Sequence, residues 1–261
     1  MSKLNADEHP MKLRDADDGA VLTRFPCPTL RRGVPSPTVL VLPGGGYASL
    51  AEHEGEPVAR RFNDAGFHAA VLRYRLGPEH RHPAMLHDAQ RAMRLLRTAE
   101  TFPAGKIAVL GFSAGGHLAG TLATHGDQNA DPADDLSPSV SARPDAAILA
   151  YPVIDLHGEH AHAGSREHLL GPSGGPDASP PLDLHRAVTT DTPPTFLWHT
   201  ADDESVPVQN SVMFADACRG HGVPHELHVF ESGSHGLGLA PHHTAAGWPD
   251  LAIAFLRRHL P

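Results

Sequence analysis

Six short, nearly continuous apolar runs, separated by longer amphipathic segments, constrain the fold of this chain more than any other feature of its sequence. A half-exposed strand alternates apolar and polar residues, whereas a strand buried on both faces of a parallel sheet is apolar almost throughout. The alternation of such runs with helical segments therefore predicts an α/β protein with a doubly wound, mostly parallel sheet and helices on both faces. The runs cover residues 38–42, 68–74, 106–112, 146–152, 195–200 and 226–230.

Three of the segments outside these runs have clear helical patterns. Residues 83–100 place their apolar side chains along one helical stripe, and residues 207–222 begin with a proline suited to a first helical turn. Residues 247–260 carry two arginines near their end, where cations favour the helix dipole. The opening part of the chain, including "AVLTRF" at residues 20–25, is predicted to add antiparallel strands at one edge of the sheet.

Two stretches interrupt the alternation. Residues 126–145 are polar and rich in Pro and Asp, which predicts a surface loop. Residues 155–194 contain Gly, Pro and several His, with a short helical piece around "SREHLL", but lack the apolar content of a separate domain. We therefore expect a single domain over residues 1–261, in which about 155–194 form a small, partial cap beside the functional site.

The composition excludes several classes of protein. A formal net charge of -9 argues against a nucleic-acid partner, because phosphate binding requires clustered Lys and Arg. Two cysteines, Cys27 and Cys218, are too few for a disulfide framework or a cysteine metal site. The N-terminal segment has no apolar core of a secretory signal, and no window approaches the roughly 18 apolar residues of a membrane span. These features predict a cytoplasmic protein without a membrane partner.

The segment "KIAVLGFSAGGHLAGTLATH" contains the strongest chemical motif of the chain. Its "GFSAG" fits the G-x-S-x-G nucleophile elbow, in which a tight turn between a strand and a helix lifts a serine, here Ser113, above the sheet edge. Gly111 and Gly115 keep Cβ atoms away from this crowded turn, and the small residues that follow allow a helix to pack close to the strand. The alternative is a glycine-rich connector whose serine only caps the helix.

A serine nucleophile requires a general base, and the base requires a group that orients it. In hydrolases with this motif the chain order is serine, acid, histidine. His235 lies between glycines after the last predicted strand, which favours it as the base. The pattern D-x-x-V-P selects Asp203 as the acid over its neighbour Asp202, and Glu231 is a third candidate. The alternative is that these acids are solvated or cap the next helix.

Acyl transfer also requires preorganised donors for the oxyanion. The loop "LPGGGY" after the first parallel strand matches the HGGG-type element, with Pro43 where His is common. We expect N–H groups of Gly45 or Gly46, with that of Ala114, to form the oxyanion hole. The same loop matches neither G-x-G-x-x-G nor a P-loop, which argues against phosphate binding. Tyr47 and His117 lie beside these motifs and are predicted to shape the substrate pocket.

With these residues the chain resembles the α/β-hydrolase superfamily, and more narrowly the bacterial esterases related to acetylxylan and feruloyl esterases. The resemblance covers nearly the whole chain, including "VLVLPGGGYASLAEHEGEPVARRF", "GFSAGGHLA", "DTPPTFLWHTADDESVPVQNS" and "GSHGLGLA". It implies an α/β-hydrolase fold and a serine esterase with Ser113 as nucleophile, Asp203 as acid and His235 as base. It also implies oxyanion donors at Gly45 and Gly46, and no metal or organic cofactor.

By analogy, the resemblance implies a small-molecule ester substrate with a short acyl group, such as an acetylated xylose unit or xylo-oligosaccharide. Two alternatives stay open. One is a related amide or peptide hydrolase, such as an arylformamidase or a prolyl-peptidase-like enzyme, because the same residues serve each reaction. The other is a binding protein on a hydrolase scaffold whose site is inactive. The sequence does not indicate the oligomeric state.

Two further features carry alternatives. A histidine-rich segment (residues 157–168) contains four possible zinc ligands close together: His157, Glu159, His160 and His162. Their spacing matches no helical H-E-x-x-H site. Solvated or substrate-facing histidines are the preferred interpretation. Trp198, beside the predicted acid, could stack on a sugar, although a tryptophan buried in a strand is the simpler interpretation.

Overall fold

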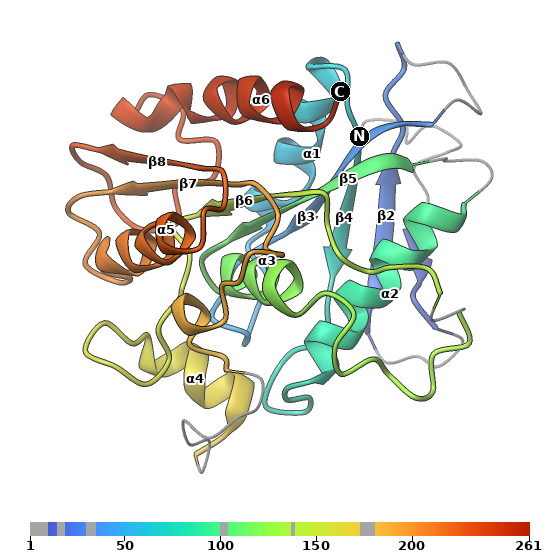
Figure 1. Cartoon of the computed structure of the whole chain (residues 1–261), viewed down its shortest axis with the longest axis horizontal. Helices are drawn as coiled ribbons and strands as arrows, with labels where there is room; N and C mark the ends of the chain where they lie inside the picture. The colour runs from blue at the N-terminus through green and yellow to red at the C-terminus, as the bar shows by residue number, and fades with distance from the viewer. Residues whose placement is uncertain (1–9, 15–18, 30–34, 100–103, 137–138, 173–180) are drawn as a thin grey trace.

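Eight strands form one sheet in the computed structural model, which describes residues 10–14, 19–29, 35–99, 104–136, 139–172 and 181–261 (Figure 1). The strand order is β1-β2-β4-β3-β5-β6-β7-β8, and all neighbours from β4 to β8 run parallel. The first two strands pair antiparallel at one edge, as predicted. The strands are β1 (Pro10–Lys12), β2 (Val21–Phe25), β3 (Ser36–Leu42), β4 (His68–Arg73), β5 (Ala104–Phe112), β6 (Ala146–Ala150), β7 (Thr195–Thr200) and β8 (His225–Phe230).

Helices cover both faces of this sheet (Figure 1). Successive side chains of a strand point to opposite faces, so Leu40 and Leu42 pack in the apolar cluster under α2, α3 and α5, while Val39 and Val41 pack under α1 and α6. The prediction of a mostly parallel, doubly wound sheet is confirmed. The helices are α1 (Glu56–Asp64), α2 (Ala84–Thr98), α3 (Ser113–His125), α4 (Ala163–Leu170), α5 (Gln209–Gly220) and α6 (Trp248–His259), with 3₁₀ turns η1 (Glu52–Glu54), η2 (Leu184–Arg186) and η3 (Thr244–Gly247).

Helix α3 is enclosed on nearly all sides. Every one of its residues except Thr124 is buried, and it contacts β3, β5 and β6. Its small side chains allow this close approach: a methyl group added at Gly116 would lie 2.8 Å from the Pro152 side chain. None of the helices within the described ranges combines the length and apolar character that a membrane span needs.

The structure refines two boundaries predicted from the sequence. The run 146–152 ends as a strand at Ala150, because Tyr151 adopts a positive φ of 35° and leaves the sheet. The helix predicted from Pro207 begins at Gln209, and the carbonyl of Pro207 accepts a hydrogen bond from Asn210 in the turn before it. Helix α1 was not predicted.

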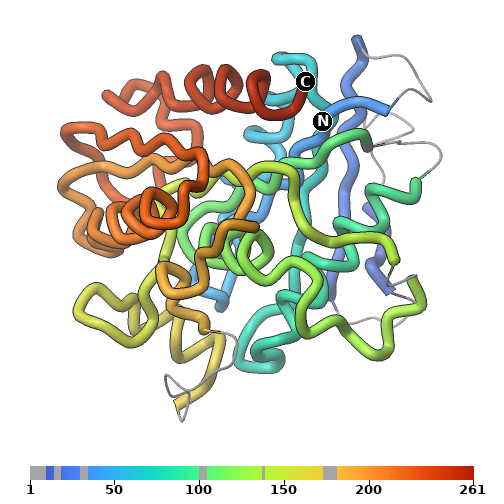
Figure 2. Tube along the Cα trace, in the orientation of Figure 1, coloured from blue at the N-terminus to red at the C-terminus, as the bar shows by residue number. Residues whose placement is uncertain are grey.

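The described parts of residues 126–145 contain no helix or strand, in agreement with the predicted loop. Arginines of α2 hold this loop: Arg91 pairs with Asp134, and Arg94 donates to the Val140 carbonyl at 3.0 Å. The described parts of residues 155–194 contain α4 and η2. Leu169 of α4 joins the apolar cluster under α3, and the Cα trace runs α4 along the same side of the sheet as α3 and α5 (Figure 2). That this segment is a cap within a single domain stays a prediction.

Candidate active site

Ser113 occupies a strained turn between β5 and α3. Its φ is 53°, a left-handed conformation that non-glycine residues rarely adopt, and its side chain lies at the carboxyl edge of the sheet. Glycines on either side make the turn possible. A methyl group at Gly111 would lie 2.7 Å from the Ala119 Cβ, and one at Gly115 would lie 2.8 Å from the Pro43 carbonyl carbon. Both distances are shorter than real Cβ contacts, so the sequence needs glycine at both positions.

The predicted nucleophile, base and acid meet in one chain of hydrogen bonds. His235 Nε2 lies 2.8 Å from Ser113 Oγ, and His235 Nδ1 lies 2.6 Å from Asp203 Oδ2. Because a carboxylate only accepts, Nδ1 carries the proton of a neutral His235 and Nε2 is free to accept the serine hydroxyl. The three residues follow β5, β7 and β8, whose carboxyl ends lie at the same edge of the sheet.

Asp203 is buried and fully hydrogen-bonded. Its Oδ1 accepts the N–H groups of Ser205 and Val206 at 2.9 and 3.0 Å, and its Oδ2 also lies 3.4 Å from His199 Nε2. Burial alone would raise the pKa of this carboxyl, but hydrogen bonds from two imidazoles and a backbone amide outweigh it and hold the pKa well below its ordinary range. Asp203 therefore stays ionised beside His235.

The neighbouring acid has a different contact. Asp202 Oδ1 accepts the N–H of Gly233 at 2.7 Å, while Thr200 Oγ1 donates to the Gly233 carbonyl at 2.7 Å. Asp202 thus joins the loop after β7 to the loop that carries His235. Glu231, the third candidate acid, is exposed.

The glycine loop after β3 lies against the nucleophile elbow, since a methyl group at Gly44 would lie 3.0 Å from Ser113 Cβ. Within the described residues, the N–H groups of Gly45, Gly46 and Ala114 make no hydrogen bond. The loop itself is held in place, because His168 Nδ1 donates to the Gly46 carbonyl at 3.1 Å and Gly77 N–H donates to the Tyr47 carbonyl at 2.8 Å. Free amides at a helix N-terminus suit a developing negative charge.

Tyr47 and His117, predicted to shape the pocket, are buried and bond to each other. His117 Nε2 lies 2.9 Å from the Leu182 carbonyl and donates to it, so Nδ1 accepts the Tyr47 hydroxyl at 2.7 Å. Burial lowers the pKa of His117 to about 4, although the bond to Leu182 opposes this, and burial raises the pKa of Tyr47 well above its ordinary value. The geometry links both residues to the shape of the glycine loop; direct substrate contact stays a prediction.

Sequence reasoning missed Glu54 and Tyr151. The Glu54 carboxylate accepts the N–H of Gly44 and the hydroxyl of Tyr151, each at 2.7 Å. The Tyr151 ring packs against His235, with ring centroids 5.1 Å apart. No motif marks either residue; the available signals were an acidic residue just after the glycine loop and an aromatic residue at the end of a buried strand.

The features considered for metal or sugar binding have other contacts. His157 Nδ1 lies 3.1 Å from Asp183 Oδ1, and His162 caps α4 by accepting the Ser165 N–H at 3.1 Å. No group of three or more His, Cys, Asp or Glu side chains suited to a metal ion occurs in the part of the chain described here. Trp198 is buried and stacks on Trp248, with centroids 5.2 Å apart.

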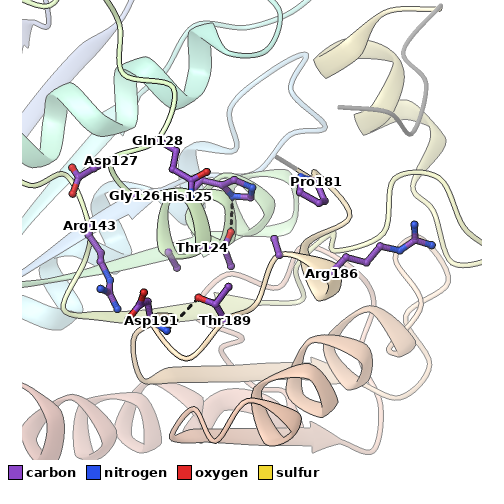
Figure 3. A pocket seen from close by; sticks show the side chains of 12 residues that line it. Thr124, His125, Gly126, Asp127, Gln128, Arg143, Pro181, Arg186, Thr189 and Asp191 are labelled. Atoms are coloured by element: carbon purple, nitrogen blue, oxygen red, sulfur yellow. Dashed lines mark hydrogen bonds between the residues drawn. The ribbon is translucent and has the colours of Figure 1, made fainter. Parts of the chain in front are cut away.

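A separate pocket of about 500 Å³ lies around the far end of α3 (Figure 3). Its lining includes His125, Gln128, Arg143 and Asp191, and none of the predicted site residues. Helix α3 therefore has Ser113 at its first residue and this pocket at its last.

Residues 28–218 match the model of the protein family BD-FAE. The chain belongs to the BD-FAE family. Among solved structures, this BD-FAE chain is similar to the acetyl ester-xyloside bifunctional hydrolase from Caldicellulosiruptor lactoaceticus, with a TM-score of 0.88, 41% identity and 98% of each chain covered. This similarity confirms the α/β-hydrolase fold.

Two curated relatives also match the BD-FAE chain. It is 39% identical over 218 residues to endo-1,4-beta-xylanase B of Butyrivibrio fibrisolvens, covering 80% of this chain and 34% of the relative. It is 32% identical over 209 residues to the acetylxylan esterase of Xylanibacter ruminicola, covering 77% and 41%. The BD-FAE chain thus spans less than half the length of either relative. The second relative is named as an esterase, and the solved structure is named as a hydrolase of acetyl esters and xylosides.

Proposed function

We propose that this chain is a serine carboxylesterase that removes short acyl groups, chiefly acetyl, from xylose-containing saccharides. One observation carries the proposal: the Ser113–His235–Asp203 hydrogen-bond chain, at 2.8 and 2.6 Å, lies beside unpaired backbone amides. The substrate class comes from the names of the relatives, two of which act on acetyl esters and on xylan or xylosides.

In the first half of the reaction, His235 Nε2 accepts the Ser113 proton as Oγ attacks the ester carbonyl. The ionised Asp203 stabilises the resulting imidazolium through Nδ1. The carbonyl oxygen becomes negatively charged and accepts hydrogen bonds from the amides of the glycine loop and of Ala114. Loss of one such donor costs about 3–4 kcal/mol in comparable serine hydrolases.

In the second half, the imidazolium of His235 gives its proton to the ester oxygen of the sugar as the bond from that oxygen to the carbonyl carbon breaks. The sugar leaves with a free hydroxyl, and an acyl group remains on Ser113 Oγ. Water then attacks this acyl-enzyme while His235 Nε2 accepts its proton. Collapse of the second tetrahedral intermediate releases the carboxylic acid and restores the serine. Every proton transfer passes through His235 Nε2, which the hydrogen-bond chain already aligns with Ser113.

The test compares acetylated xylo-oligosaccharides with butyryl, feruloyl and amide substrates. We expect the highest kcat/KM on acetyl esters, and a loss of at least about 10³-fold in Ser113→Ala. A fluorophosphonate should label the wild type at Ser113. Ser234→Ala is the matched control, because Ser234 is an exposed hydroxyl next to His235 and its removal should leave both labelling and turnover unchanged. Turnover of amides alone would refute the ester assignment, and an unlabelled wild type would indicate an inactive scaffold.

A further inference from the structure

Glu54 is a buried carboxylate that packing alone does not explain. It is 2% exposed, and within the described residues it forms no hydrogen bond with Lys or Arg. The nearest imidazole, His53 Nε2, lies 3.9 Å from Glu54 Oε1 and bonds the Gly236 carbonyl at 2.8 Å. Burying a carboxylate is costly unless hydrogen bonds satisfy it, and an apolar residue of similar size would be cheaper at a purely structural position.

One oxygen of Glu54 fixes the start of the glycine loop. Oε2 accepts the Gly44 N–H at 2.7 Å. A methyl group added at Gly44 would lie 2.9 Å from that oxygen and 3.0 Å from Ser113 Cβ. Gly44 is therefore sandwiched between the carboxylate and the nucleophile, and its position determines where the next amides, those of Gly45 and Gly46, point.

The other oxygen of Glu54 reaches the loop of the base through Tyr151. The Tyr151 hydroxyl donates to Oε1 at 2.7 Å and accepts the Gly238 N–H at 2.9 Å. The Tyr151 ring packs against His235. Trp248 Nε1 donates a hydrogen bond to the Gly238 carbonyl at 2.9 Å. Tyr151 keeps this place at the expense of a positive φ of 35°. Such strain persists where the surroundings fix a functional geometry.

We infer that Glu54, acting through Tyr151, is a positioning residue that sets the oxyanion loop and the His235 loop in register with each other. The inference rests on the proposed function, since it gives both loops a catalytic task. It also explains why the residue is glutamate. Only a carboxylate accepts from both the amide and the hydroxyl; a glutamine would place an N–H₂ group against one donor.

The experiment compares Glu54→Gln and Tyr151→Phe with the wild type in hydrolysis of an acetyl ester. Both variants nearly keep the shape of the side chain. Glu54→Gln replaces one acceptor oxygen by an N–H₂ group, and Tyr151→Phe removes the hydroxyl that bonds both Glu54 and Gly238. Misplacing catalytic groups by about 1 Å costs roughly 100-fold, so we expect kcat to fall about 10- to 100-fold while KM changes less than about 3-fold. Affinity for a trifluoromethyl ketone, which forms a tetrahedral adduct with the serine, should fall in parallel. The kcat of the double variant should equal that of the less active single variant, because both residues act through one network.

Asp145→Asn is the matched control. Asp145 also accepts one backbone amide, that of Ile107 at 2.8 Å, and one side chain, Arg97 at 2.9 Å, but it lies toward the opposite end of β5. This variant should lower the melting temperature and leave kcat unchanged.

Three results would overturn the inference. The first is Glu54→Gln with wild-type kcat and ketone affinity, and the second is a lower melting temperature in both site variants without a change in kcat. The third applies if Glu54→Gln does not fold: an unchanged kcat in Tyr151→Phe would then overturn the inference. A wild type that hydrolyses no ester would instead overturn the proposed function, and the inference with it.

Discussion

The close packing of Gly115 predicts that a single methyl group there impairs stability and activity together. In Gly115→Ala the new Cβ would lie 2.8 Å from the Pro43 carbonyl carbon and closer still to the carbonyl oxygens of Leu42 and Pro43. All of these atoms are backbone, so no side chain can rotate out of the way. The end of β3 and the start of the glycine loop must move instead.

The magnitude follows from the overlap. Ordinary Cβ contacts begin at 3.4 Å, so the backbone must yield by about 0.6 Å at the carbonyl carbon and by more at the oxygens. Overpacking of this kind costs about 1–3 kcal/mol, offset by a gain of nearly 1 kcal/mol from alanine in a helix. A net loss of about 1 kcal/mol lowers the melting temperature of a protein of this size by roughly 3 °C. Because the shift displaces the oxyanion donors, kcat should fall by about 100-fold.

The control is Gly120→Ala in the same helix. There the new Cβ would lie 2.6 Å from Leu184 Cδ1, the end of a flexible side chain, so the cost is small and the helix gain remains. Calorimetry would give the melting temperatures, and hydrolysis of a chromogenic acetyl ester would give kcat. If Gly115→Ala matches Gly120→Ala in both measurements, the elbow is not as tightly constrained as the structure indicates.

Two further predictions concern charge. Asp203→Asn should lower kcat by about 10³- to 10⁴-fold, because the amide cannot stabilise the imidazolium of His235. Asp202→Asn should lower kcat less than about 10-fold. Equal losses of kcat in steady-state assays would contradict the assignment of Asp203 as the acid. The pKa of His117 is lowered to about 4 in the folded protein from an ordinary value near 6.5. As the pH falls, His117 therefore takes up a proton in the unfolded chain before it does so in the folded protein. The contribution of neutral His117 to the free energy of unfolding is complete above about pH 6.5 and is lost progressively down to about pH 4. At pH 5 the loss is about 2 kcal/mol. In urea unfolding at pH 7 and 5, His117→Gln should show a smaller difference than the wild type, and an equal difference would refute this origin.

The sequence was sufficient for the parts of the molecule that depend on local pattern. Continuous apolar runs identified β3 to β7, whose faces are both covered, and also β8, an edge strand in which no residue is buried. The G-x-S-x-G motif and the chain order of serine, acid and histidine selected Ser113, Asp203 and His235, which the structure brings within hydrogen-bonding distance. The pattern D-x-x-V-P favoured Asp203 over Asp202, and in the structure Asp203 Oδ2 lies 2.6 Å from His235 Nδ1 while its Oδ1 accepts the amides of residues 205 and 206.

The parts that the sequence did not predict depend on contacts between distant residues. Glu54 and Tyr151 are 97 positions apart, and neither has a meaning until the sheet brings the glycine loop next to the end of β6. Helix α1 was missed although it packs Val58, Ala59 and Phe62 into the core. Its N-cap is Gly55, which has no side chain to form a capping hydrogen bond, so the usual start signal of a helix is absent.

The near-complete burial of α3 determines how the site is assembled. A short helix of mostly small side chains has little stability of its own, so its stability comes from packing against β3, β5 and β6. Ser113, the proposed nucleophile at its first residue, therefore depends on this packing for its geometry. During denaturant titration, turnover should vanish in the same cooperative transition as the near-ultraviolet circular dichroism, which would make enzymatic rate a direct reporter of native population.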